Sequence, residues 1–175
     1  MVIKNKAIFL DRDGVLVKSL IYKKKGYAPK TLKEFKILPK VTRYCKLLKK
    51  KGFKLIIVTN QPDISRGLIL KSDFKKMNEI LKIRTNFDEI YVSTSISNKS
   101  YFRKPNPGML IQAIKKYKLD VEKCFMIGDR NSDIMAAHKV GCKSIFIKRN
   151  YAEKKPKLQI KNVNSFAEAA RYIIR

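Results

Sequence analysis

Apolar and polar residues alternate along the chain in blocks that predict strands followed by helices. Short runs with hydrophobic residues on both faces are typical of buried strands, and they occur at residues 7–10, 54–59, 89–92, 124–127 and 144–147. Helices are predicted between and after them, at residues 40–50, 72–84, 107–117, 132–140 and from 165 onward. Parallel neighbours in a sheet need such crossover connections, so the pattern predicts an α/β fold with a doubly wound, mainly parallel sheet flanked by helices.

Several local signals refine this picture. Ser72 suits the N-cap of the second helix, and Ser165 with Glu168 forms a capping-box pattern at the start of the last one. Residues 15–39 hold no long periodic segment, and within them residues 15–21 predict a β-flap with its turn at residues 23–26. Residues 60–70 predict a loop. These connections join one sheet, so we expect a single domain over residues 1–175.

Polar side chains follow the predicted strands where each strand ends. Ligands in doubly wound folds gather beyond the carboxyl ends of the strands, so these side chains are expected to share one rim of the sheet. The rim residues at strand ends are Asp11, Asp13, Thr59, Asn60 and Asp129, and Lys104 joins them from the loop after the third strand. Their common placement predicts a functional site there.

The first strand ends in two carboxylates that suit phosphoryl transfer. Asp11 and Asp13 lie two residues apart, so in extended chain they face the same point, and they repel one another unless a cation or a proton lies between them. We expect Asp11 to attack phosphorus and Asp13 to protonate the leaving group and then deprotonate water. Mg²⁺ would be held by Asp11, Asp129 and the main-chain carbonyl of Asp13. For the two aspartates alone, an ordinary strand followed by an Asp-Gly turn remains the alternative.

The other rim residues suit the same chemistry. Thr59 offers a hydroxyl and Asn60 an amide to the phosphoryl oxygens, and Lys104 supplies a compact positive charge for the transferring group. Each has a plainer alternative when taken singly: Thr59 as a strand residue, Lys104 as one lysine among many, and Asp129 as a helix cap.

Four motifs in this order resemble the haloacid dehalogenase-like phosphatases. They are Asp-Arg-Asp-Gly-Val at residues 11–15, Thr-Asn-Gln at 59–61, Arg-Lys-Pro-Asn-Pro-Gly-Met at 103–109 and Gly-Asp-Arg-Asn-Ser-Asp at 128–133. More narrowly, they resemble the branch of that family that contains heptose-bisphosphate and histidinol-phosphate phosphatases. The resemblance implies a Rossmann-like fold, Mg²⁺ dependence and the roles given above. It also implies that Asp133 orders metal-bound water, although a carboxylate is favourable in any first helical turn.

The chain departs from that branch in its loops. Many members carry a Cys/His zinc loop before Arg-Lys-Pro, whereas residues 93–102 offer no such ligand, so we expect no zinc. Residues 14–40 and 93–104 are too short to form a cap domain, which predicts an uncapped site. Arg66 and Arg103 are then the candidates to bind a second phosphate or a sugar hydroxyl, with surface charge as the alternative.

Composition adds a strong positive charge, since 41 Lys and Arg face 14 Asp and Glu for a net charge of +27. This charge fits either a nucleic-acid partner or a biased composition that also attracts phosphate esters, and aromatic residues interleaved for base stacking are not evident. Three scattered cysteines are expected to be buried free thiols, and His138 a helix residue outside the chemistry. No apolar stretch approaches the length of a membrane span, and we expect a cytoplasmic monomer without a signal peptide.

The leading hypothesis from the sequence is therefore a phosphatase for a phosphorylated sugar, specifically a heptose bisphosphate. The alternatives are a polynucleotide 3′-phosphatase, which would use the positive charge, a histidinol-phosphate phosphatase, and a catalytically silent scaffold. The complete set of Asp11, Asp13, Lys104 and Asp129 argues against the scaffold.

Overall fold

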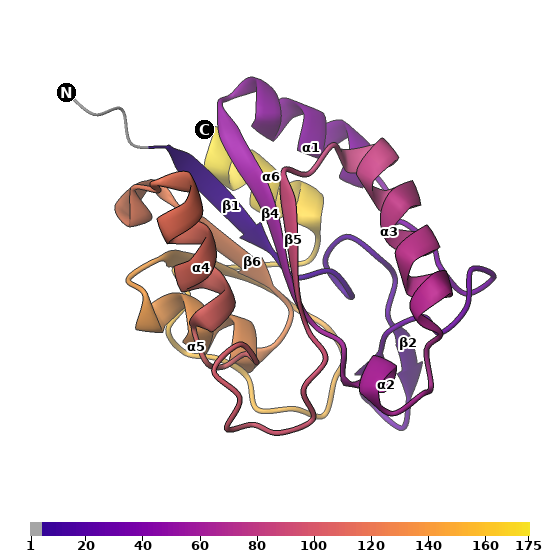
Figure 1. Cartoon of the computed structure of the whole chain (residues 1–175). Coiled ribbons are helices and arrows are strands. Elements are labelled where there is room, and N and C mark those ends of the chain that lie inside the picture. Colours follow the sequence, from indigo (N-terminus) through magenta and orange to yellow (C-terminus); the bar gives the residue numbers. More distant parts are fainter. Residues whose placement is uncertain (1–4) are drawn as a thin grey trace.

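The computed structural model describes residues 5–175, and their centre is a six-stranded sheet with the order β5-β4-β1-β6-β7-β8 (Figure 1). All five neighbouring pairs in this sheet are parallel. The strands are β1 (Lys6–Leu10), β4 (Phe53–Asn60), β5 (Glu89–Ser93), β6 (Phe125–Gly128), β7 (Lys143–Ile147) and β8 (Lys161–Val163). The predicted doubly wound parallel sheet is thus confirmed.

Helices cover both faces of the sheet (Figure 1). The helices are α1 (Val41–Lys50), α2 (Pro62–Ser65), α3 (Lys71–Thr85), α4 (Gly108–Tyr117), α5 (Asn131–Lys139) and α6 (Phe166–Ile174), with a 3₁₀ turn η1 (Val121–Lys123). Residues of α1, α3 and α6 share one hydrophobic cluster, and residues of α4 and α5 share the other. This arrangement leaves the carboxyl ends of the strands free of helical cover.

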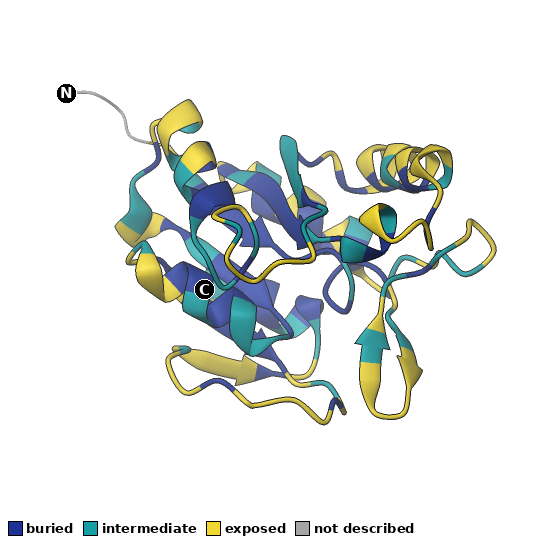
Figure 2. Ribbon diagram, turned by 60° about the horizontal axis from the view of Figure 1, so that its bottom comes forward, coloured by how far each residue is buried: buried dark blue, intermediate teal, exposed yellow. Residues whose placement is uncertain are grey.

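Alternation along the central strands explains the two layers. Ile8 and Leu10 of β1 belong to the cluster with α1, whereas Ala7 and Phe9 belong to the cluster with α4. Successive side chains of a strand point to opposite faces, so a central strand with helices on both sides must be apolar throughout. Figure 2 shows the result as a buried sheet inside a more exposed shell.

Three short elements differ from the sequence-based expectations. β8 was not predicted, and α2 lies within residues that were predicted as a loop. The flap is the antiparallel hairpin of β2 (Leu20–Tyr22) and β3 (Lys25–Tyr27), which projects from the body as an exposed ribbon (Figure 2). Its strands are shorter than the expected flap because residues 14–17 form a tight turn instead.

Of the two helix N-caps predicted from the sequence, the structure contains one. Ser72 lies inside α3, because the N-cap is Leu70 and makes no side-chain cap hydrogen bond, so the Ser72 prediction is wrong. Ser165 does cap α6, where its Oγ accepts from the Glu168 main-chain N–H at 3.2 Å. The Glu168 carboxylate in turn accepts from the main-chain N–H of Asn164 at 3.0 Å.

The remaining sequence-based expectations concern single residues. Cys45, Cys124 and Cys142 are buried and free, as predicted. His138 is exposed on α5. Within residues 5–175, no helix combines the length and the apolar character that crossing a lipid bilayer requires.

Candidate active site

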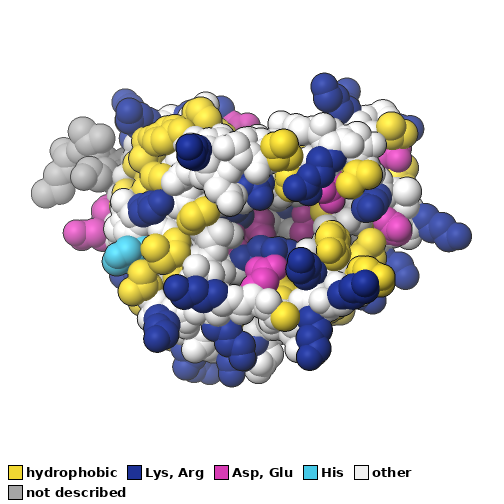
Figure 3. Space-filling model, turned by 90° about the horizontal axis from the view of Figure 1, so that it is seen from below, with side chains coloured by type: hydrophobic (Ala, Val, Ile, Leu, Met, Phe, Trp, Pro, Cys, Tyr) yellow, Lys and Arg dark blue, Asp and Glu magenta, His cyan; other side chains and the backbone are white. Residues whose placement is uncertain are grey.

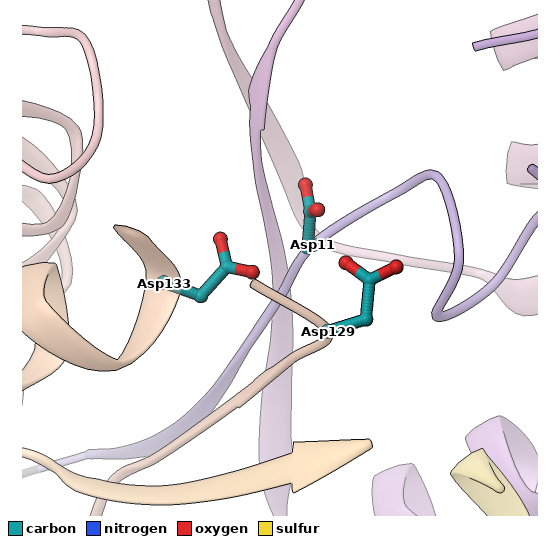
Figure 4. A group of neighbouring side chains, drawn as sticks. All are labelled: Asp11, Asp129 and Asp133. Carbon is teal, nitrogen blue, oxygen red and sulfur yellow. The ribbon is translucent and has the colours of Figure 1, made fainter. Parts of the chain in front are cut away.

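Three carboxylates meet at the carboxyl end of the sheet. Asp11 follows β1, Asp129 follows β6 and Asp133 lies in the first turn of α5, and one oxygen of each lies within 4.8 Å of the others. Figure 4 shows the three side chains entering a common space from these separate segments. Seen from below, acidic side chains lie inside a hollow, and several Lys and Arg side chains lie in and around it among uncharged residues (Figure 3).

The sheet itself brings these carboxylates together. β1 and β6 are parallel neighbours with Leu10 opposite Ile127, so the residues that follow each strand leave the sheet side by side. The main-chain N–H of Asp11 still donates to Ile127 O at 3.0 Å. Gly14 is required here, because a Cβ at this position would lie 1.8 Å from Asp129 Oδ2 and its φ is +85°.

Lys104 neutralises part of this negative charge. Its Nζ lies 2.9 Å from Asp11 Oδ1 and 2.6 Å from Asp133 Oδ1, and it donates to Val58 O at 2.7 Å. Burial acts to lower the pKa of Lys104, but the two carboxylates outweigh it, so the pKa lies above its ordinary value. Lys104 is therefore a fixed positive charge in the middle of the site.

The carboxylates nevertheless remain in electrostatic excess. Burial, Asp11 and Asp133 together raise the pKa of Asp129 well above its ordinary value. Burial raises the pKa of Asp133 to about 6, with Asp11 adding to the effect and Lys104 opposing it. Asp129 Oδ1 is buried and has no hydrogen-bond partner among the described residues. Three oxygen donors in negative excess with an orphaned oxygen fit a hard divalent cation.

Asp13 points to a different part of the site from the three carboxylates. Its Oδ2 accepts from Gln61 Nε2 at 2.6 Å, and the same Gln61 nitrogen donates to Thr59 Oγ1 at 2.9 Å. Burial raises the pKa of Asp13, Arg12 opposes this shift, and Asp11 adds to it. A carboxyl whose pKa is raised holds a proton more readily, as a general acid must.

The Asn60 side chain contacts the main chain of Lys104. Its Nδ2 donates to Lys104 O at 2.9 Å, and its Oδ1 accepts from the Lys104 main-chain N–H at 3.1 Å. The amide is thus held against the loop that carries Lys104, and this contact uses one of its two N–H groups. Asn60 fixes the position of Lys104, although it still lines the cavity described next.

A cavity of about 430 Å³ opens above these groups. Arg66 and Arg103 line it, as does Arg130, whose role the sequence did not suggest. Arg66 pairs with Asp63 at 2.9 Å, and Arg103 Nη1 donates to Ser95 O at 2.8 Å. Burial lowers the pKa of Arg103, and the charges of Arg66 and Arg130 lower it further. Arg130 pairs with Glu153 at 2.6 Å. We call these three guanidinium groups the arginine wall of the cavity, and they add positive charge to it although Arg66 and Arg130 each already have a carboxylate partner.

The structure brings together every predicted site residue and adds three that sequence reasoning missed. All of Asp11, Asp13, Thr59, Asn60, Lys104 and Asp133 line the cavity with the two predicted arginines, and Asp129 lies beside Asp11 and Asp133. The missed residues are Gln61, Arg130 and Tyr151. Gln61 and Arg130 lie inside quoted motifs, so their adjacency to Asn60 and Asp129 was the available signal. Tyr151 stands in a lysine-rich stretch without any such signal.

Comparison with known proteins gives a consistent result. The family model described as haloacid dehalogenase-like hydrolase matches residues 10–147. The chain is 34% identical over 143 residues to the D-glycero-beta-D-manno-heptose-1,7-bisphosphate 7-phosphatase of Helicobacter pylori strain J99. This alignment covers 78% of this chain and 79% of that protein. It is 31% identical over 157 residues to the D-glycero-alpha-D-manno-heptose-1,7-bisphosphate 7-phosphatase of Photorhabdus laumondii, covering 82% of each.

A solved structure shows the same fold. The D,D-heptose 1,7-bisphosphate phosphatase of B. bronchiseptica, crystallised with magnesium and phosphate, superposes with a TM-score of 0.83. The superposition covers 97% of this chain and 98% of that one at 21% sequence identity. The two chains therefore share nearly their whole architecture.

Proposed function

The chain belongs to the haloacid dehalogenase-like hydrolases, and from this premise we propose that it removes the 7-phosphate of D-glycero-D-manno-heptose 1,7-bisphosphate with the help of Mg²⁺. The observation that carries the proposal is the position of Lys104 between Asp11 and Asp133, beside Asp129 and below a wall of arginines. Heptose-bisphosphate phosphatases that resemble the chain over more than three quarters of its length support the choice of substrate.

Asp11 is the nucleophile in this proposal. Lys104 holds its Oδ1, and we assign the attack on phosphorus to Oδ2. The new O–P bond forms as the ester O–P bond breaks, which gives an aspartyl phosphate and an alkoxide. Lys104 also offsets the charge that would repel the incoming phosphate, because it is buried between the carboxylates.

Asp13 moves the protons. We assign to it the proton that passes to the departing sugar oxygen, and burial, which raises the pKa of Asp13, favours the protonated form that this step needs. The carboxylate so formed then takes a proton from the water that attacks the aspartyl phosphate; the water O–P bond forms as the Asp11 Oδ2–P bond breaks, which releases phosphate and restores the Asp11 carboxylate. Gln61 fixes Asp13 Oδ2 for both steps, and its second contact, to Thr59 Oγ1, ties the acid to the phosphate-binding end of β4.

Asp11, Asp129 and the main-chain carbonyl of Asp13 would hold Mg²⁺, and Asp133 would order its water. Mg²⁺ supplies positive charge to the phosphoryl oxygens when it is bound. The protein's own part is to keep the carboxylates ionised and oriented despite their burial, which Lys104 and the Arg130 main-chain N–H do for Asp133.

The arginine wall selects for a substrate with a second phosphate. Arg66, Arg103 and Arg130 line the same cavity as the catalytic groups, and we place the 1-phosphate of a bisphosphate among their guanidinium groups. Histidinol phosphate carries an ammonium group instead, which three guanidinium groups would repel. The wall therefore favours the bisphosphate over this alternative.

A polynucleotide 3′-phosphatase is the second candidate, and the net charge of +27 favours it. The deciding measurement is phosphate release with Mg²⁺ from heptose 1,7-bisphosphate anomers, histidinol phosphate, hexose monophosphates and a 3′-phosphorylated oligonucleotide. We expect the bisphosphate to be preferred, and Asp11→Asn to abolish release from every substrate. Preference for the oligonucleotide would establish the second candidate, and full activity of Asp11→Asn would refute the mechanism.

A further inference from the structure

Tyr151 is buried at the active site although it comes from the exposed connection between β7 and β8. The side chain is 9% exposed, whereas its neighbours Asn150 and Ala152 are exposed. A large side chain buried in a lysine-rich loop indicates that the loop is anchored at this point.

The Tyr151 hydroxyl reaches the carboxylate group directly. It donates to Asp129 Oδ2 at 2.9 Å. The other oxygen, Asp129 Oδ1, is buried and makes no hydrogen bond with the described residues. One oxygen of Asp129 is thus held by the phenol, and this fixes the direction in which the other one points.

The ring lies in a seat that the β2–β3 hairpin provides. A Cβ on Gly26 would lie 2.5 Å from Tyr151 Cζ, so any side chain at Gly26 would displace the ring. The Ala152 main-chain N–H donates to Lys24 O at 2.8 Å, which ties the loop to the hairpin. Arg130 completes the seat, since its guanidinium lies 5.3 Å from the ring centroid and donates to Gly26 O at 2.6 Å.

From these contacts we propose that Tyr151 is a positioning residue for the metal site, one that orients Asp129 toward a divalent cation, and that the hairpin and the 148–160 loop act together as its support. The proposal rests on the metal site of the proposed function. It does not depend on which phosphate ester is the substrate. Groups that hydrogen-bond a metal ligand fix its orientation, and their loss typically weakens metal binding roughly 10- to 100-fold.

The first test is Tyr151→Phe, which keeps the ring in its seat and removes only the hydroxyl. Calorimetric titration of the substrate-free protein with Mg²⁺, and with Mn²⁺ as a second probe, gives the dissociation constant without any turnover. We expect it to rise about 10-fold. Tyr172→Phe is the matched control on α6, and it should bind the ions as the unmodified protein does.

The second test is Gly26→Ala, which leaves Tyr151 intact and blocks its seat. We expect a loss of metal affinity similar to that of Tyr151→Phe, and Lys25→Ala on the same hairpin should show none. Near-ultraviolet circular dichroism and thermal unfolding establish that each variant is folded.

The outcomes are decisive in both directions. Unchanged Mg²⁺ and Mn²⁺ affinity in folded Tyr151→Phe would overturn the proposal, as would the absence of divalent-cation binding by the unmodified protein. Binding that weakens as expected, in a protein that hydrolyses no phosphate ester, would support the role of Tyr151 and refute the proposed function separately.

Discussion

Lys104 and the carboxylates around it are each costly to bury, and each offsets the cost of the others. The Lys104 side chain is 2% exposed and those of Asp11 and Asp133 are 9% and 0% exposed. An unpaired charge at such depth would lose several kcal/mol of hydration free energy. Lys104 is therefore expected to stabilise the fold of the metal-free protein in addition to its part in catalysis.

Replacing Lys104 by Met tests this expectation, because Met keeps much of the volume and removes the charge. We expect the metal-free protein to lose roughly 3–5 kcal/mol of unfolding free energy, as when one partner of a buried ion pair is removed. Saturating Mg²⁺ should recover part of the loss, since the cation replaces the missing positive charge. Phosphate release should fall by roughly 10²–10³-fold even with Mg²⁺ present.

Denaturant titrations with and without Mg²⁺ measure the effect of Lys104→Met on stability. Lys99→Met provides the matched control, because Lys99 is exposed. A destabilisation that Mg²⁺ leaves unchanged would show that the lysine is needed for packing rather than for charge balance.

At this scale, the sequence predicts residues whose placement follows from strand ends alone. Asp11 and Asp129 could be assigned because parallel strands deliver their following residues to one rim, whereas Lys104 lies in a long loop and was assigned with the help of its motif. Tyr151 could not, because its contact with Asp129 depends on the path of an irregular loop across the hairpin. The contact of the Asn60 amide with the Lys104 main chain could not be predicted either, because the sequence does not show that these two loops lie side by side.

At the scale of elements, the edge strand β5 is tied to α4 by a polar cluster. The Glu89 carboxylate of β5 is bonded to the Lys116 ammonium and accepts from the Tyr117 hydroxyl at 3.1 Å. The hydrogen bond from Lys116 lowers the pKa of Glu89, burial opposes this shift, and Tyr117 lowers the pKa further. This contact joins a strand at the edge of the sheet to a helix on one of its faces.

Because the pKa of Glu89 is lower in the folded protein than its ordinary value of 4.5, the contact stabilises the fold above that pH. Its contribution is lost as the pH falls through the folded-state pKa. We expect Glu89→Gln to cost roughly 0.2–1 kcal/mol of unfolding free energy at pH 7, because the pair is partly exposed, and progressively less below about pH 4.5.

Thermal unfolding of both proteins across this pH range provides the measurement. Glu79→Gln makes the same substitution in the exposed pair with Lys75, whose side chains are 80% and 58% exposed for Lys75 and Glu79, and should have little effect at any pH. A Glu89→Gln deficit that stays constant down to pH 3 would show that the hydrogen-bonding geometry matters and the charge does not.

The long apolar elements could be predicted, and the short ones at the periphery could not. β4 and α1 carry enough hydrophobic residues to define their periods. β8 is Lys-Asn-Val, a short edge strand with only Val163 buried, so neither alternation nor hydrophobicity marks it. The helix α2 has four residues, of which Asp63 is the buried one, so it shows no hydrophobic period and was predicted as a loop.

For the molecule as a whole, the net charge is +27, and Lys and Arg side chains are spread over the face that holds the hollow leading to the site (Figure 3). Such a field attracts any phosphate ester before contact and is screened by salt, with a Debye length of about 10 Å at 0.1 M and about 3 Å at 1 M. Charge of this kind speeds the encounter of the enzyme with its substrate and does not change the rate of the chemical step.

We therefore expect kcat/KM for the heptose bisphosphate to fall several-fold as NaCl rises from roughly 0.05 to 0.5 M, with kcat nearly constant. A hexose monophosphate carries less charge and should show a shallower dependence.

The oligonucleotide separates the two explanations of the charge. If the charge only attracts small esters, a 3′-phosphorylated oligonucleotide should inhibit weakly at low salt. Strong inhibition that disappears steeply with salt would instead reveal a surface that binds nucleic acid along its length, because each phosphate contact releases a counterion. That outcome would reverse the ranking of the two candidate functions, whereas a kcat/KM that is insensitive to salt would leave the positive charge without a part in substrate capture.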